Sequence, residues 1–129
     1  MADYSTLFRG KKILVVDDNR MNRLVALAFL KKVDVLADYV ENGREAVEAV
    51  QAKEYDAILM DIQMPVMNGY EATLQIREIN ARMGRVPIIA VSANTIKENR
   101  VKCMECGMNC FIEKPLKQTE LYDVLSSLL

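Results

Sequence analysis

The amino-acid sequence predicts an α/β domain in which a parallel five-stranded sheet carries helices on both of its faces. Short apolar runs rich in β-branched residues alternate with amphipathic stretches five times, which is typical of sheets built from strand–helix units. The length of 129 residues fits one domain. With 5 glycines, 3 prolines and no linker or repeat, the sequence predicts a single domain over residues 11–129, preceded by an N-terminal extension, residues 1–10.

The expected strands are the short apolar runs, at residues 12–17, 37–41, 56–61, 87–92 and 109–113. A helix is expected after each strand, at residues 20–32, 43–53, 70–81, 96–107 and 118–129. We expect the doubly wound strand order 2-1-3-4-5, in which strands 1 and 3 flank the point where the order reverses.

Local signals support individual helices. Asn19 precedes the first helix as a candidate N-cap, because its side chain can accept a hydrogen bond from a free backbone N–H group of the first turn. The third helix follows a loop that contains Pro65 and the turn signal Asn68–Gly69. Apolar residues share one side of the second and last helices: Ala46, Val47 and Val50, and Leu121, Val124, Leu125 and Leu128.

Composition excludes several classes of protein. Apolar residues make up 51% and charged residues 27% of the chain, as in a globular protein rather than a disordered one. The net charge of -1 and the pI near 5.5 argue against nucleic-acid binding as the main function. No apolar run approaches the roughly 18 residues that a membrane span needs, and the first residues lack the apolar core of a signal peptide. The absence of histidine excludes histidine zinc sites and Ser-His-Asp triads.

Three cysteines, Cys103, Cys106 and Cys110, lie close together near the end of the fourth helix. A closed zinc site needs four ligands, and only three thiols and no histidine are present. We therefore interpret them as free thiols that are buried or half-buried at a helix end, in a reducing compartment.

Polar side chains follow the predicted strands at the point where each strand ends. Asp17 and Asp18 end the first strand, Asp61 the third and Ser92 the fourth, and Lys114 follows the fifth. Because the carboxyl ends of parallel strands meet at one edge of the sheet, we expect the three carboxylates to converge in one crevice, with the hydroxyl and the ammonium on its wall.

Three carboxylates in one crevice repel each other unless one is protonated or a cation lies among them. The available ligands are oxygens, which favours a hard divalent cation such as Mg²⁺. A carboxylate beside Mg²⁺ and a lysine is a good phosphoryl acceptor, because both cations neutralise the oxygens of the transferring group. A hydroxyl at the fourth strand could then donate a hydrogen bond to that group.

The sequence resembles the receiver domain of two-component response regulators over residues 11–129. The resemblance rests on four segments at matching spacings: VVDDN at 15–19, MDIQMPVMNG at 60–69, VSAN at 91–94 and EKP at 113–115. It implies the flavodoxin-like doubly wound (βα)₅ fold. The segments at 16–23, 61–73 and 92–94 most resemble receivers attached to hybrid sensor histidine kinases.

The resemblance implies a role for each polar residue at the strand ends. Asp61 is expected to accept the phosphoryl group and Lys114 to contact it, through a cis peptide bond with Pro115. Ser92 is expected to act as the switch hydroxyl, followed by rotation of Phe111. The expected metal ligands are Asp17, Asp18, Asp61 and the backbone carbonyl of Gln63, with Mg²⁺ as the metal and Mn²⁺ as a substitute.

The resemblance also implies partners and a location. The phosphoryl donor would be a phosphohistidine of a histidine kinase or a histidine phosphotransfer protein, since this chain has no histidine. We expect a cytoplasmic monomer or weak dimer that contacts neither nucleic acid nor membrane, and whose parent protein can be membrane-anchored. Such a domain catalyses its own phosphorylation and dephosphorylation, without being a conventional enzyme.

Two other functions are compatible with the acidic cluster. One is a Mg²⁺-dependent hydrolase or phosphatase that forms an aspartyl-phosphate, but the residue two positions after Asp61 is Gln63, where such an enzyme needs a second acid. The other is a binding module that has lost the chemistry, against which the complete set of five polar residues argues.

The first helix contains seven consecutive apolar residues, at 24–30, so it is apolar on every side. By analogy with the family, Val25 and Phe29 should face the sheet. A docking patch of four residues should then be exposed beside the crevice, ready to receive a helical bundle that carries the donor histidine; burial of this helix or a homodimer are the alternatives. The patch consists of Met21, Leu24, Leu27 and Ala28.

Overall fold

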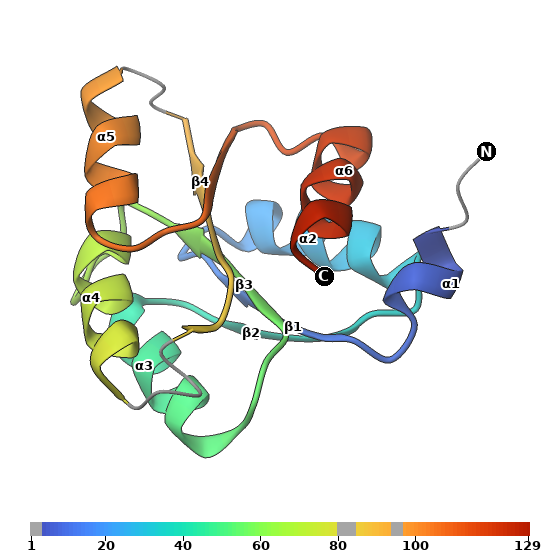
Figure 1. Ribbon diagram of the computed structural model, residues 1–129, viewed down its shortest axis with the longest axis horizontal. Helices are drawn as coiled ribbons and strands as arrows, with labels where there is room; N and C mark the ends of the chain where they lie inside the picture. The colour runs from blue at the N-terminus through green and yellow to red at the C-terminus, as the bar shows by residue number, and fades with distance from the viewer. Residues whose placement is uncertain (1–3, 80–84, 94–96) are drawn as a thin grey trace.

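The computed structural model describes residues 4–79, 85–93 and 97–129. All five strands are parallel and follow the order β2-β1-β3-β4-β5, as the sequence predicts (Figure 1). The strands are β1 (Lys12–Val16), β2 (Leu36–Val40), β3 (Ala57–Asp61), β4 (Ile88–Ser92) and β5 (Cys110–Glu113). The helices of the described residues are α1 (Tyr4–Phe8), α2 (Arg20–Lys31), α3 (Gly43–Ala52), α4 (Gly69–Ile79), α5 (Lys97–Glu105) and α6 (Gln118–Leu128).

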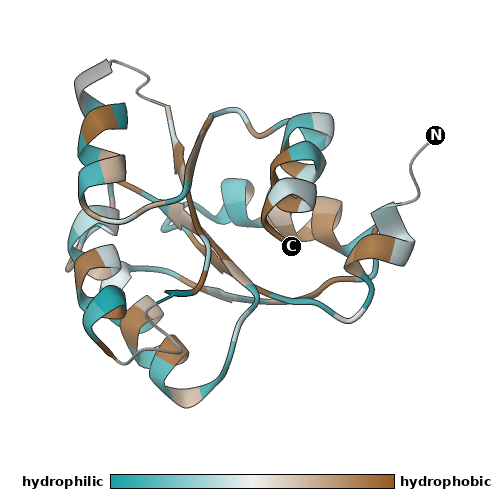
Figure 2. Ribbon diagram, viewed as in Figure 1, coloured by the Kyte–Doolittle hydropathy of each residue, from teal (hydrophilic) through white to brown (hydrophobic). Residues whose placement is uncertain are grey.

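The helices form two layers around the sheet. Helices α1, α2 and α6 cover one face, and α3, α4 and α5 cover the other (Figure 1). Successive strand residues point to opposite faces: Leu14 packs under α3 and α4, whereas Ile13 and Val15 pack under α2 and α6. Helices α2, α3, α4 and α6 carry both apolar and polar residues (Figure 2), and each buries one side against the sheet.

Burial falls from the centre of the sheet to its edge. Every residue of β3 and β4 is buried, while every residue of the edge strand β2 is half-buried or exposed. This explains why the central strands appear in the sequence as continuous apolar runs. Predicted and observed bounds differ by one or two residues at most ends, where they can be compared; Ala81 and Ile96, expected at helix ends, lie outside the described residues.

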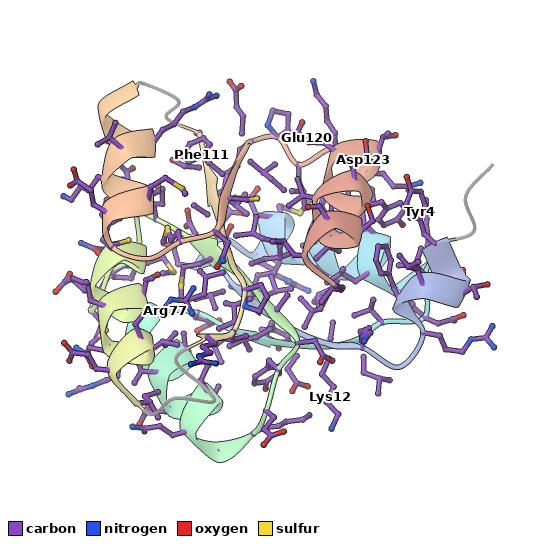
Figure 3. All side chains as sticks on the ribbon, in the orientation of Figure 1. Tyr4, Lys12, Arg77, Phe111, Glu120 and Asp123 are labelled. Carbon is purple, nitrogen blue, oxygen red and sulfur yellow. The ribbon has the colours of Figure 1, made fainter. Side chains whose placement is uncertain are left out.

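The short helix α1 was not predicted, because residues 4–8 are too few to show a helical period. Its aromatic side chains nevertheless join the core: Phe8 is fully buried, and Tyr4 and Phe8 both pack against Tyr122 of α6. The hydroxyl of Tyr4 donates to Oδ1 of Asp123 at 2.9 Å, and both residues lie where α1 meets α6 (Figure 3). The segment 1–10 therefore contributes a core residue to the domain.

Helix α2 matches our expectation in part: Phe29 is half-buried and packs against the core. Its buried residues are Arg23, Ala26 and Leu30, at the i, i+3, i+7 spacing of one helix face. The expectation that Val25 faces the sheet was wrong, since 38% of its surface is exposed. An apolar run without polar interruptions does not reveal which side of the helix is buried.

The cysteines match their prediction: all three thiols are free, Cys103 and Cys106 are buried, and Cys110 is half-buried. Burial raises the pKa of both buried thiols, which keeps them protonated and unreactive at neutral pH. In the part of the chain that the structure describes, no helix combines the length and the apolar character needed to cross a membrane.

Candidate functional site

The acidic residues at the strand ends converge as predicted. Strands β1 and β3 are neighbours, so Asp17, which follows β1, lies beside Asp61 at the end of β3. Carboxylate oxygens of Asp17, Asp18 and Asp61 lie within 4.8 Å of one another. Asp17 and Asp61 are buried and Asp18 is exposed, so the cluster opens to solvent on one side.

Lys114 binds both buried carboxylates. Its Nζ lies 3.1 Å from Oδ2 of Asp17 and 3.1 Å from Oδ1 of Asp61. The backbone N–H of Lys114 donates to the carbonyl of Ser92 at 2.8 Å, which ties the end of β5 to the end of β4. The Lys114–Pro115 bond is cis, as the resemblance implied.

Asp17 is held through each of its polar groups. Its N–H donates to the carbonyl of Val40 at 3.2 Å, and its Oδ1 accepts from the N–H of Asn19 at 2.9 Å. Asn19 is also the N-cap of α2, as predicted. The Asp17 carbonyl accepts from Nη1 of Arg23 at 2.9 Å. Sequence reasoning missed Arg23; the available signal was a charged residue directly before a run of apolar ones.

The crevice lacks enough positive charge for its carboxylates. Burial, followed by the negative charge of Asp17, raises the pKa of Asp61 to about 6, although Lys114 opposes this shift. Burial lowers the pKa of Lys114, but the charges of Asp61 and Asp17 outweigh it and raise that pKa overall. A divalent cation bound by the three carboxylates would offset their repulsion, and its preferred ligands are the oxygens present here.

The loop after β3 is shaped by close backbone contacts. Gly69, the first residue of α4, donates its N–H to the carbonyl of Ile62 at 2.8 Å, and an added Cβ would overlap the backbone carbonyl of Asp61. Within the loop, Val66 has φ of 70°, and the N–H of Met67 donates to the carbonyl of Pro65 at 2.7 Å. A β-branched residue in this conformation is strained, and strain of this kind clusters at functional sites.

The remaining predicted site residues lie around the crevice. Ser92 ends β4 and is buried, and Gln63 is exposed two residues after Asp61. Phe111 in β5 is half-buried against the core (Figure 3), and the Arg100 guanidinium lies 5.3 Å from its ring centroid.

Three of the four docking-patch residues are exposed: Met21, Leu24 and Ala28. Leu27 is half-buried and packs against the core under α2 and α6, so its expected full exposure was wrong. A recess of about 80 Å³ lies between α2 and the segment after β5, and its wall includes Val25, Leu116 and Lys114. The recess therefore lies between the exposed Val25 of α2 and Lys114, which binds Asp61.

Residues 13–126 match the family model of the response regulator receiver domain. Among curated proteins, the probable histidine kinase 5 of Oryza sativa subsp. japonica is 35% identical, in an alignment that covers 96% of this chain and 12% of that protein. The hybrid signal transduction histidine kinase L of Dictyostelium discoideum is 40% identical, over 88% of this chain and 7% of that protein. The chain thus spans about a tenth of the length of these relatives.

Solved receiver domains have the same fold. The receiver domain of the sensor histidine kinase PA1611 from Pseudomonas aeruginosa, with magnesium in its active-site cleft, has a TM-score of 0.85 and 40% identity, covering 92% of this chain and 97% of that one. The receiver domain of the histidine kinase CKI1 from Arabidopsis thaliana, complexed with Mg²⁺ and BeF₃⁻, has a TM-score of 0.83 and 38% identity. The match covers 96% of this chain and 93% of that one.

A third structure contains a receiver together with its partner. It is the complex of the Saccharomyces cerevisiae histidine phosphotransfer protein Ypd1 with the receiver domain of Ssk1. The match has a TM-score of 0.86 and 28% identity, and it covers 94% of this chain and 90% of that one. The family model, the relatives and the crevice agree, and the chain belongs to the response regulator receiver domain family of two-component phosphorelay signalling.

Proposed function

We propose that this domain accepts a phosphoryl group on Asp61 from a phosphohistidine of a partner protein. The observation that carries the proposal is the joint position of Asp61, the acidic pair Asp17 and Asp18, and the ammonium of Lys114. One carboxylate oxygen of Asp61 attacks phosphorus, the P–N bond to the donor imidazole breaks, and the imidazole leaves with the bonding electron pair. The product is an acyl phosphate on Asp61.

Each residue of the crevice has a defined task in this proposal. Asp17, Asp18, Asp61 and the backbone carbonyl of Gln63 hold Mg²⁺, for which Mn²⁺ can substitute. The bound cation supplies positive charge that neutralises oxygens of the transferring group. Lys114 leaves its carboxylate partners to contact a phosphoryl oxygen, and the hydroxyl of Ser92 donates to another.

Phosphorylation acts as a switch in this proposal. Ser92 moves toward the phosphoryl group, and Phe111 moves into the space that Ser92 vacates. The half-buried ring of Phe111 and its contact with Arg100 define the starting position of that movement.

The proposed donor is a histidine kinase or a histidine phosphotransfer protein. It would dock on Met21, Leu24 and Ala28, with Leu27 at the edge, because a donor imidazole must reach Asp61 in line with the carboxylate. The Ypd1–Ssk1 complex supports a histidine phosphotransfer protein as this partner. We further propose a cytoplasmic location, a monomer or weak dimer without contacts to nucleic acid or membrane, and an origin within a hybrid histidine kinase, as in the relatives above.

A short experiment tests the proposal and its alternatives. The protein is incubated with acetyl phosphate and Mg²⁺, and its intact mass is measured. Addition of one phosphoryl group supports the receiver function. Turnover of acetyl phosphate without an adduct would indicate a hydrolase, which the neutral Gln63 and the family relationships do not favour. No reaction would indicate a binding module.

A further inference from the structure

Arg23 is a charged residue in the buried stripe of α2. Its guanidinium has three partners: Nη1 donates to the Asp17 carbonyl at 2.9 Å, Nη2 lies 3.3 Å from Oε1 of Glu41, and the carbon at its centre lies 5.1 Å from the centroid of the Tyr39 ring. Tyr39 and Glu41 lie at the end of the edge strand β2. Arg23 therefore connects this edge of the sheet to the residue that begins the acidic cluster.

The carbonyl that Arg23 binds belongs to the peptide that joins Asp17 to Asp18. Strand β1 ends at Val16 and α2 begins at Arg20, so neither the sheet nor the helix supplies this carbonyl with its usual partner. A peptide is a rigid plane, and fixing its carbonyl fixes the Cα positions of both residues that it connects. The N–H on the other side of Asp17 is held by Val40 of the same edge strand.

We propose that Arg23 is a positioning residue for the proposed cation site: it fixes the peptide between the two aspartates so that both carboxylates face Asp61. The inference rests on the cation binding of the proposed function, and it assigns Arg23 a role through Asp17 rather than a contact with the metal. Residues that orient metal ligands commonly change metal affinity by about 10–100-fold when replaced.

The direction in which Mg²⁺ affinity changes when Arg23 is replaced distinguishes a positioning role from simple electrostatics. Arg23 is positively charged, so as a mere neighbouring charge it would repel a cation, and its replacement by a neutral residue would strengthen Mg²⁺ binding. A positioning role predicts weaker Mg²⁺ binding, because the loss of carboxylate orientation lowers the affinity more than the removal of a repelling charge raises it. Arg23→Met keeps most of the apolar stem and removes the guanidinium.

The test compares Mg²⁺ dissociation constants, measured by titration calorimetry at pH 7.5, for the parent, Arg23→Met, Arg23→Lys and the control Arg20→Met. Arg20 is exposed in the first turn of the same helix, so its variant removes the same charge from α2. We expect Arg23→Met to bind Mg²⁺ about tenfold more weakly. Arg23→Lys keeps the charge but lacks the planar guanidinium that contacts two partners at once, so its Mg²⁺ affinity should lie between those of Arg23→Met and the parent. Arg20→Met should bind as tightly as the parent or more tightly.

A second readout uses the rate of labelling by acetyl phosphate as a function of Mg²⁺ concentration. Arg23→Met should need about tenfold more Mg²⁺ for half of its maximal rate and should recover most of the parent's rate at saturation. Unchanged or tighter Mg²⁺ binding by Arg23→Met would overturn the inference while leaving the proposed function intact.

Absence of Mg²⁺ binding by the parent would overturn the inference together with the cation site. If circular dichroism shows that Arg23→Met is unfolded, Arg23→Lys decides: a threefold or greater loss of affinity supports the positioning role, and the parent's affinity refutes it.

Discussion

The Nζ of Lys114 lies 3.1 Å from Oδ1 of Asp61, although 53 residues separate them in the chain. The contact exists because β3 and β5 both end at the same edge of the parallel sheet, and β4 between them carries Ser92. In the metal-free protein the ammonium partly compensates two buried carboxylates. It is therefore already in the crevice when a phosphoryl group arrives.

Asp61→Asn should abolish phosphorylation and stabilise the metal-free protein. The change keeps the shape of the side chain and an acceptor for Lys114, but it removes a buried charge whose pKa is raised by burial and by Asp17. We expect a gain of about 1–2 kcal/mol in the free energy of unfolding at pH 7 with EDTA. Chemical denaturation measures the gain, and intact mass after acetyl phosphate checks the labelling. A phosphoryl adduct on this variant would refute Asp61 as the acceptor.

The stability difference between Asp61→Asn and the parent should depend on pH. With a raised pKa of about 6 in the folded state, against 3.8 in the unfolded chain, Asp61 binds its proton more tightly when the protein is folded. Asp61 therefore contributes to the parent's free energy of unfolding at low pH, and this contribution is lost as the pH rises through about 6. The advantage of Asp61→Asn should be small at pH 4.5 and largest above pH 7. Denaturation in EDTA across this range checks it, and an advantage that grows toward low pH would contradict the direction of the shift.

Gly69→Ala should both destabilise the fold and impair phosphorylation. The added Cβ would overlap the carbonyl of Asp61 and lie 2.9 Å from Cα of Ile62, and these backbone atoms cannot rotate away. We expect a loss of about 1–3 kcal/mol and slower labelling by acetyl phosphate, because relief of the overlap displaces Asp61.

Gly10→Ala is the matched control for that change. Gly10 has φ of 77° but no atom within 4 Å of an added Cβ, so its replacement introduces backbone strain without overlap. It should cost about 1 kcal/mol and leave the labelling rate unchanged. If both variants lost labelling equally, general destabilisation would explain the effect of Gly69→Ala.

Arg77→Met should destabilise the domain without changing the crevice. The Arg77 guanidinium donates to the carbonyls of Val86 and Gly107 and to Oδ1 of Asn109, at 2.6–3.0 Å, and so links α4 to the starts of β4 and β5 (Figure 3). Loss of these bonds removes this donor from the carbonyls of Val86 and Gly107, whereas Oδ1 of Asn109 still accepts from the N–H of Ile88, and we expect a cost of about 2–4 kcal/mol. Denaturation measures the loss; Arg77→Lys should recover part of it, and an unchanged Mg²⁺ affinity distinguishes this arginine from Arg23.

The features predicted from the sequence are those set by local pattern and strand position. Asp17, Asp61 and Ser92 could be placed together because parallel strands share one carboxyl edge. Helix α1 could not be predicted, because its five residues owe their position to Tyr122, which lies far along the chain. The buried side of α2 was missed because the run 24–30 is apolar throughout, and the buried residue that precedes it, Arg23, is a charged one.

The switch predicts a spectroscopic change at Phe111. When Ser92 is drawn to the phosphoryl group, the ring of Phe111 should move inward and lose its contact with the Arg100 guanidinium. The ring resonances of Phe111 should therefore shift when Mg²⁺ and beryllofluoride are added to the parent. The same addition to Asp61→Asn is the control and should leave them unchanged. Unshifted resonances in the parent would contradict the switch.

The docking proposal predicts a selective defect in Leu24→Glu. Leu24 is 47% exposed on α2 next to the crevice, and a charge at this position should disfavour an apolar partner surface without disturbing Asp61. Leu74→Glu is the matched control, because Leu74 is 51% exposed on α4, which packs on the other face of the sheet. We expect Leu24→Glu to slow phosphotransfer from a cognate phosphohistidine protein at least tenfold, equivalent to about 1.4 kcal/mol in the transition state, and to leave labelling by acetyl phosphate unchanged. Leu74→Glu should retain both activities. Equal loss with both donors would show damage to the fold or the crevice, and equal phosphotransfer by the parent and Leu24→Glu would place the docking surface elsewhere.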